Sequence, residues 1–270
     1  MSASHMIDVD GFQLHAIVED GKGRPVVFGH GLLFDWRSWV GQIPLMGVDH
    51  RVVAFDSRGH GLSTLPEGDW TIEDQADDYA RVMDSLGVDQ AVVVGESMGG
   101  MAALHLALRH PQRVKGLVLV GTSASAETLY QRTRYRLLVL MARLLGMRPW
   151  LLTEGSKAMF GATFRRTQPE QVKQWMEPIA GYDPKVIART MRPVMKRPSV
   201  VGRLPTITAP ALVIVGDEDQ TTPPRESEVM AERMPNARLV TLGGTGHMSP
   251  IEKPEQIAVL IREFLREIGW

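Results

Sequence analysis

The sequence predicts an α/β fold, in which one mostly parallel sheet is flanked by helices and interrupted by a helical insertion. Short apolar runs alternate with segments of helical length, which is typical of β-α-β units. One run, residues 91–94, leads through a tight glycine-rich turn directly into a helix-forming segment. Residues 124–203, the insertion, lack this rhythm. We therefore expect a core of residues 1–123 and 204–270 and a helical cap of residues 124–203.

The chain opens with a predicted hairpin, because apolar residues alternate on both sides of a possible Asp10-Gly11 turn. A helix is expected at residues 71–86, where acidic residues fill the first turn, and another at 254–268, which starts with proline and has one apolar face. A helical stretch with Trp36 and Trp39 is expected after the predicted strand at residues 25–28. The remaining strands are expected at residues 25–28, 51–56, 91–94, 116–121, 211–216 and 238–242.

The turn after residues 91–94 reads Gly95-Glu96-Ser97-Met98-Gly99, which matches the pattern G-x-S-x-G. In a sharp strand-to-helix turn the serine occupies a strained backbone position, and the flanking glycines let the helix pass close to the strand. Ser97 is therefore the candidate nucleophile.

A serine hydroxyl needs a nearby base to become an effective nucleophile. His247 is the candidate, because it lies in the flexible loop after the last predicted strand and gives the chain order of serine, acid, histidine that this turn favours. We expect activity to rise as His247 loses its proton, at about pH 6–7 for an unperturbed histidine. The other histidines considered lie in earlier loops or on the helix behind Ser97: His30, His60, His105 and His110.

The acid that orients His247 is expected in the loop after residues 211–216, where Asp217, Glu218 and Asp219 compete. An oxyanion also needs donors, and backbone N–H groups suffice. The N–H of Met98 is one, because it lies at a helix N-terminus, and Gly31 or Leu32 is expected to supply the other.

Four motifs resemble those of α/β-hydrolase-fold serine hydrolases: His30-Gly31-Leu32, residues 56–63, residues 95–99 and Gly246-His247. The family places its acid three residues after the glycine that ends the strand, so the resemblance selects Asp219. It also implies an eight-stranded sheet, with Leu32 and Met98 as the oxyanion donors. We interpret the Asp, Arg and His of residues 56–63 as structural, because polar groups in such turns commonly fix them by hydrogen bonds.

Within the family, residues 95–101 and 221–224 are similar to carboxylesterases and 3-oxoadipate enol-lactone hydrolases. Haloalkane dehalogenases and epoxide hydrolases carry Asp at the nucleophile position, so Ser97 argues against both. Hydrolases of carbon–carbon bonds usually have a glycine-rich oxyanion loop, from which Leu32-Leu33-Phe34 departs.

Composition excludes several other classes of protein. The formal net charge is -1, which does not favour nucleic-acid binding, and the absence of cysteine excludes disulfides, thiolate metal ligands and a cysteine nucleophile. The N-terminus lacks the apolar core of a signal peptide, and the apolar run 137–142 is too short to span a bilayer. We expect a cytoplasmic protein with no membrane insertion.

Charge is unevenly distributed along the chain. The insertion has 15 basic and 5 acidic residues, a net charge of +10, which leaves -11 on the rest. These cations either form solvated faces and pair with the acidic core, or attract an anionic substrate such as an ester or lactone with a free carboxylate.

Together these features predict a hydrolase of small-molecule ester or lactone bonds, with no cofactor and no metal. The same three residues could also serve acyl transfer, perhydrolysis, cyanohydrin cleavage or carbon–carbon bond cleavage. A receptor-like member that only binds its ligand is a further alternative. The sequence leaves the oligomeric state and the exact substrate open.

Overall fold

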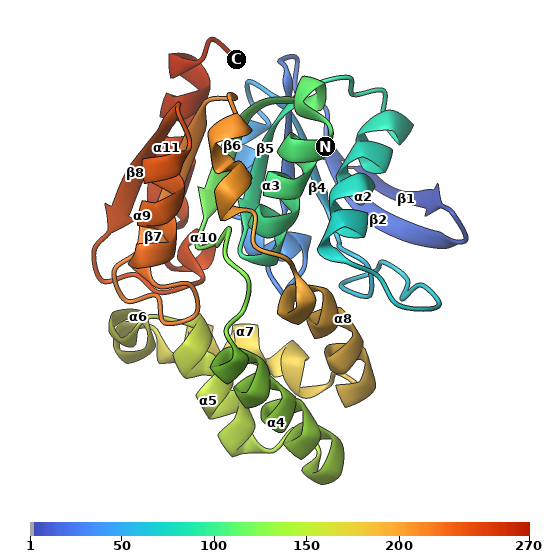
Figure 1. Ribbon diagram of the computed structural model, residues 1–270, viewed down its shortest axis with the longest axis vertical. Helices are drawn as coiled ribbons and strands as arrows, with labels where there is room; N and C mark the ends of the chain where they lie inside the picture. The colour runs from blue at the N-terminus through green and yellow to red at the C-terminus, as the bar shows by residue number, and fades with distance from the viewer. Residues whose placement is uncertain (1–2) are drawn as a thin grey trace.

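An eight-stranded sheet runs through the middle of the protein in the computed structural model, which describes residues 3–270 (Figure 1). The order of the strands is β1-β2-β4-β3-β5-β6-β7-β8; β1–β2 and β2–β4 pair antiparallel, and all later pairs are parallel. This confirms the predicted fold class. The strands are β1 (Ala3–Val9), β2 (Phe12–Glu19), β3 (Pro25–Gly29), β4 (Arg51–Phe55), β5 (Ala91–Glu96), β6 (Val114–Val120), β7 (Ala211–Gly216) and β8 (Ala237–Leu242).

The opening hairpin turns at Asp10 and Gly11, both of which have positive φ. Its first strand begins at Ala3, four residues before the alternating run that starts at Ile7, because residues 3–6 also pair with β2 along the sheet edge. Met1 and Ser2, which start the segment expected to lack a signal peptide, lie outside the described residues.

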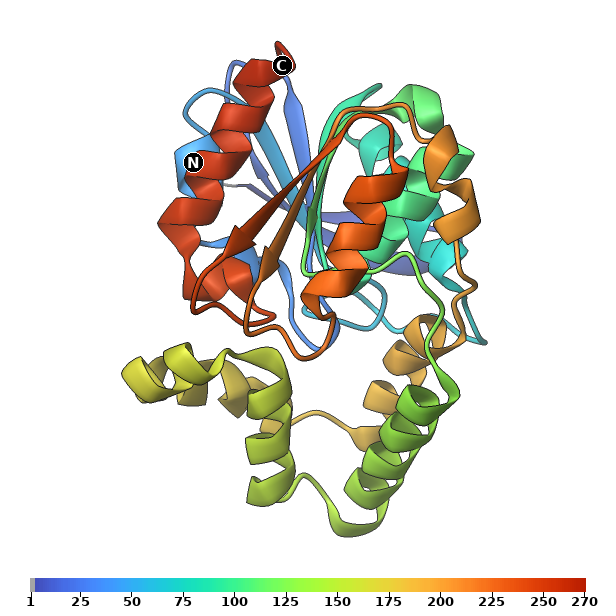
Figure 2. The same ribbon diagram turned by 60° about the vertical axis from the view of Figure 1, so that its left-hand side comes forward.

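Helices cover both faces of the sheet, and each face has its own apolar core (Figure 2). One core packs α2 (Ile72–Ser85), α3 (Met98–Arg109) and α9 (Pro224–Arg233) against the sheet. The other packs α1 (Ile43–Met46), α11 (Pro254–Glu267) and the short 3-10 helix Trp36–Trp39. Thr71 and Asp74 form a reciprocal capping box that fixes where α2 begins.

Five helices and no strand lie between β6 and β7 in the described part of the chain. They are α4 (Leu129–Leu145), α5 (Pro149–Met159), α6 (Ala162–Thr167), α7 (Pro169–Ala180) and α8 (Pro184–Lys196). Figure 2 shows them grouped beyond the carboxyl ends of the parallel strands. Side chains that follow those strands therefore face this group of helices. The short α10 (Ser249–Glu252) lies just before α11.

The two connections between the core and these helices lie side by side. The N–H of Val200 donates to the carbonyl of Ala124 over 2.8 Å. Next to it, a buried ion pair joins Arg197 to Glu127 at 2.6 Å. The chain therefore leaves the sheet after β6 and returns to it before β7 through one paired neck.

Across residues 3–270, the helices are all too short or too polar to cross a membrane.

Candidate active site

Ser97 lies in the turn between β5 and α3, with φ 49° and ψ -115°. This region is unfavourable for a residue with a side chain, so the surrounding structure must hold the turn in place. A Cβ atom on Gly95 would come within 2.6 Å of the backbone of Gly99 and Gly100. One on Gly99 would come within 2.5 Å of the carbonyl oxygen of Gly29. Both glycines of the motif are thus needed for close packing.

The structure brings Ser97, His247 and Asp219 into one chain of hydrogen bonds. Nε2 of His247 lies 2.9 Å from Oγ of Ser97, and Nδ1 lies 2.9 Å from Oδ2 of Asp219. The other two carboxylates of the loop have different partners. Asp217 accepts the N–H of Thr245 at 3.4 Å, and Glu218 accepts the N–H and hydroxyl of Thr163 at 2.8 and 2.6 Å. Of the three competing acids, only Asp219 reaches the imidazole.

Three hydrogen bonds fix the carboxylate of Asp219. The N–H groups of Thr221 and Thr222 each donate to Oδ1 over 2.9 Å, and the hydroxyl of Thr222 donates to Oδ2 over 2.9 Å. Thr222 is a residue whose role was not predicted from the sequence. Its signal was its place three residues after Asp219, where a threonine can close a turn onto an acidic side chain.

Glu96 is a second residue that sequence reasoning missed. Its side chain is fully buried, and Oε1 lies 3.5 Å from Nε2 of His247. Burial raises the pKa of Glu96 to about 8; His247 opposes the rise and Asp219 adds to it. The signal was a carboxylic acid at the end of an otherwise apolar buried strand, directly before Ser97.

The same charges act on His247. Burial disfavours its protonated form, but Asp219, Glu96 and Glu252 outweigh burial and raise the pKa of His247 to about 9. Glu252 is itself held by the N–H groups of Gly161 and Gly246, the latter at 2.9 Å. The titration of His247 is thus expected above the ordinary histidine range.

The loop after β3 lies directly beside the Ser97 turn. The N–H of Gly99 donates to the carbonyl of His30 over 3.1 Å, and Gly31 is so close to Glu96 that a Cβ would lie 2.1 Å from Oε2. The N–H groups of Leu32 and Met98 have no acceptor within residues 3–270. Two unpaired donors on adjacent loops can bind an oxyanion.

Residues 56–63 pack as a fixed turn. The carboxylate of Asp56 accepts the N–H groups of Trp36 and Leu62, at 2.8 and 3.0 Å, and contacts Nδ1 of His15 at 2.8 Å. Arg58 forms a buried ion pair with Asp78. Each charged group is used within the turn or by its neighbours, which agrees with our structural interpretation.

A cavity of about 350 Å³ lies between the insertion and the core. Leu33 and Thr221 line it from the core side; Leu33 lies in the loop after β3, and Thr221 donates its N–H to Asp219. The walls are mainly apolar and include Leu138, Met176 and Ile179. Charged groups also line it: Glu154 and Lys157, which pair at 2.6 Å, and Arg134, which has no ion-pair partner in the described chain. The described residues contain no cluster of three or more His, Asp or Glu side chains suited to a metal ion.

A family model described as alpha/beta hydrolase fold matches residues 24–254. The chain belongs to the α/β-hydrolase family. The resemblance of its four motifs to that family is thereby confirmed, and the family is one of hydrolases.

This α/β hydrolase is also similar to proteins with named activities. It is 30% identical to a 2-hydroxymuconate semialdehyde hydrolase of Pseudomonas sp. (strain CF600), over 92% of this chain and 89% of that one. A thermophilic esterase from Thermogutta terrifontis, solved with malate bound, is 29% identical with a TM-score of 0.88 over 99% of both chains. The enol-lactonase from Burkholderia xenovorans LB400 is 27% identical, with a TM-score of 0.89 over 97% of this chain and 100% of that one.

Proposed function

We propose that this α/β hydrolase cleaves carboxylic ester or lactone bonds of a small molecule through an acyl-enzyme intermediate on Ser97. The observation that carries this proposal is the 2.9 Å contact between Oγ of Ser97 and Nε2 of His247, beside the two unpaired N–H groups of Leu32 and Met98. An acyl-transfer site needs an activated hydroxyl and oxyanion donors together.

In the proposed reaction, Oγ of Ser97 attacks the carbonyl carbon while Nε2 of His247 accepts the hydroxyl proton. The N–H groups of Leu32 and Met98 stabilise the tetrahedral oxyanion, and Asp219 stabilises the imidazolium. His247 then gives its proton to the leaving alkoxide. Water, deprotonated by His247, attacks the acyl-enzyme and releases the acid, which restores Ser97.

We further propose that residues 124–203 act as a cap that selects the substrate, because they supply most of the cavity wall beside the site. The apolar walls suit a substrate with a hydrocarbon body, and Arg134 offers a partner for a carboxylate. A similar esterase is described with malate bound, and another similar protein is an enol-lactonase. The bound malate supports a substrate that carries a carboxylate, and the enol-lactonase supports a lactone.

Cleavage of a carbon–carbon bond is the second candidate, because one relative at 30% identity is named 2-hydroxymuconate semialdehyde hydrolase. The loop Leu32-Leu33-Phe34 disfavours it, since bulky side chains replace a glycine-rich segment there. A screen of esters, lactones and ring-cleavage products with identification of the products separates the two. Competing alcohol and peroxide acceptors in the same screen detect acyl transfer and perhydrolysis.

Ser97→Ala tests the proposal directly. We expect ester hydrolysis to fall by roughly 10³-fold or more while thermal unfolding stays cooperative. A fluorophosphonate should label the wild-type protein on Ser97 and leave the variant unlabelled. Ser85→Ala, a change at an exposed serine at the end of α2, is the matched control and should keep full activity and labelling. Full activity of Ser97→Ala on every ester would contradict the mechanism.

A further inference from the structure

The outer side of α4 exposes a concentration of apolar side chains. Of the thirteen large apolar side chains exposed in the described chain, seven lie between residues 129 and 150, under a tenth of its length. They are 44% to 78% exposed and include Leu129, Tyr130, Leu137, Leu140, Leu144 and Trp150. Isolated exposed leucines are ordinary on protein surfaces, but a contiguous group marks an interaction surface.

Four of these residues form one stripe along α4. At 100° per residue, Leu129, Leu137, Leu140 and Leu144 all project within a quarter of the helix circumference. The side of α4 that lines the cavity beside Leu33 and Thr221 is a different one. The stripe therefore does not belong to the proposed substrate site, and both views place α4 at the outer margin of the protein (Figures 1 and 2).

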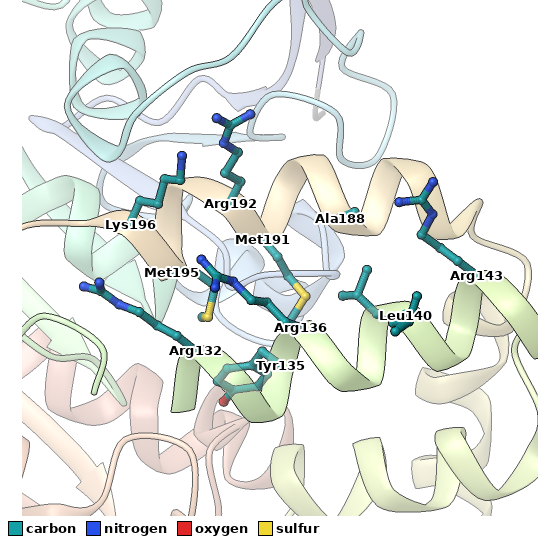
Figure 3. Close-up of a pocket in the computed structure, with 11 residues that line it drawn as sticks. Arg132, Tyr135, Arg136, Leu140, Arg143, Ala188, Met191, Arg192, Met195 and Lys196 are labelled. Atoms are coloured by element: carbon teal, nitrogen blue, oxygen red, sulfur yellow. The ribbon is translucent and has the colours of Figure 1, made fainter. Parts of the chain in front are cut away.

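A basic groove of about 450 Å³ adjoins the stripe between α4 and α8. It is lined by five cationic side chains and no acidic one (Figure 3): Arg132, Arg136, Arg143, Arg192 and Lys196. Arg192 pairs with Asp69 of the core. The other four have no ion-pair partner among residues 3–270. Leu140 belongs to both the stripe and the groove, so apolar and cationic side chains form one continuous surface.

The combination of an apolar stripe and a basic groove indicates which partner this surface binds, a second copy of the chain or a lipid surface. A second copy of the chain, docked by the same face, would bring together two insertions that each carry a charge of +10. Such like-charge contact opposes association. An anionic lipid surface offers both of the required features, negative phosphates for the arginines and an apolar boundary for the leucines.

We propose that this protein binds peripherally to anionic lipid surfaces through the α4 stripe and the α4/α8 groove. The leucines enter the boundary between headgroups and acyl chains, Tyr130 and Trp150 lie at headgroup level, and the arginines contact lipid phosphates. The charge of -11 on the rest of the chain is repelled by the same surface, which orients the protein with the insertion towards the lipid.

Co-sedimentation with vesicles tests this inference independently of the proposed hydrolysis. The intact protein should bind phosphatidylcholine vesicles that contain roughly 30 mol % phosphatidylglycerol, but not pure phosphatidylcholine, and about 0.5 M salt should release it. The double variant Arg136→Gln/Arg143→Gln should bind about 30-fold more weakly, because each lost charge costs roughly fivefold. Leu137→Asp/Leu144→Asp should bind at least about tenfold more weakly.

Controls distinguish this surface from general stickiness. Val48→Asp, at a 74% exposed apolar site of the core, and Arg233→Gln on α9 should leave vesicle binding unchanged. Hydrolysis of a neutral water-soluble ester should be the same in all these variants, which shows that they fold. Absence of binding to the anionic vesicles overturns the proposal. So does a dimer in light scattering that Leu137→Asp/Leu144→Asp converts to a monomer, since a second copy would then occupy the stripe.

Discussion

At the scale of single residues, His247 lies between two carboxyl groups whose surroundings differ. Asp219 accepts three hydrogen bonds from its own loop, which fix the position of its carboxyl group. Glu96 is buried beside the oxyanion loop, and burial favours its neutral form. The imidazole thus contacts a fixed carboxyl group at Nδ1, and near Nε2, where the proton of Ser97 would arrive, it has Glu96, whose pKa is raised to about 8.

Asp219→Asn should lower kcat by roughly 10³- to 10⁴-fold, because an amide neither fixes the required tautomer of His247 nor stabilises the imidazolium. The measurement is steady-state hydrolysis of a soluble ester. Asp217→Asn is the matched control two residues away. It should remain within about twofold of wild type, since the carboxylate of Asp217 accepts the N–H of Thr245 rather than contacting the imidazole. Equal losses in both variants would speak against Asp219 as the orienting acid.

Glu96→Gln should move the pH dependence of kcat/KM to lower pH. The base is neutral His247, so activity rises as pH passes the pKa of His247, which is raised to about 9. Removing the negative charge of Glu96 removes one cause of the raised pKa of His247. The rising limb of the pH profile of kcat/KM should therefore move to lower pH by about one unit. Glu96→Asp keeps the charge and should move the limb less. A limb that stays in place in Glu96→Gln would show that Glu96 does not act on His247.

At the scale of elements, the site depends on β5, the Ser97 turn and α3 fitting closely against the loop after β3. The backbone of Gly99 touches that of Gly29, and the N–H of Gly99 is bonded to His30. This contact holds the N–H groups of Leu32 and Met98 on neighbouring loops. A change in packing here should alter the spacing of the two proposed oxyanion donors as well as the stability of the fold.

Gly99→Ala should therefore lower the free energy of unfolding by about 1–3 kcal/mol, because its Cβ would meet backbone atoms that cannot rotate away. Urea denaturation gives the change in stability, and the kcat of the folded fraction should fall with it. Gly202→Ala, where nothing lies within 4 Å of the added Cβ, should change stability by less than about 0.5 kcal/mol. Wild-type stability of Gly99→Ala would contradict the close fit.

Much of this arrangement could be predicted from sequence. The apolar runs at residues 91–94 and 211–216 are buried on both faces, so their composition alone indicates central strands. The choice between Gly31 and Leu32 could not be made from the residues, because it depends on which N–H a loop leaves unpaired.

Glu96 was missed because its neighbour His247 lies 151 positions later in the numbering, and nothing local indicates that contact. The apolar side of α4 was equally hidden, since helical spacing alone does not tell a buried face from an exposed one.

At the scale of the whole molecule, positive charge on the insertion faces negative charge on the core. The sequence left open whether these charges pair with each other. In the described chain, Arg192 with Asp69 is the one ion pair between a cation of the insertion and a carboxylate of the core. Most of the excess charge is therefore unneutralised and acts on whatever approaches the cavity.

The kcat/KM for a carboxylate-bearing ester should fall about three- to tenfold between low and high salt, because screening weakens its attraction to the insertion. The matched neutral ester should be insensitive to salt. Arg134→Gln should reduce the preference for the anionic ester, measured as the ratio of the two kcat/KM values, while Arg233→Gln on α9 should not. The same salt response for both esters would rule out a role of the insertion's charge in substrate capture.

The paired neck also affects which parts of this protein can be replaced, in evolution or by design. β6 and β7 are direct neighbours in the sheet, so the two ends of the segment 124–203 lie next to each other. Replacing residues 124–203, which lie beyond the Val200–Ala124 hydrogen bond, with another segment requires no new strand pairing. The entropic cost of closing a loop also grows only slowly with its length. The proposed catalytic residues of the core and the proposed substrate-selecting residues of the cap can thus be replaced independently. Residues 124–203 are therefore a natural unit for recombination and for building chimaeras with altered substrate range.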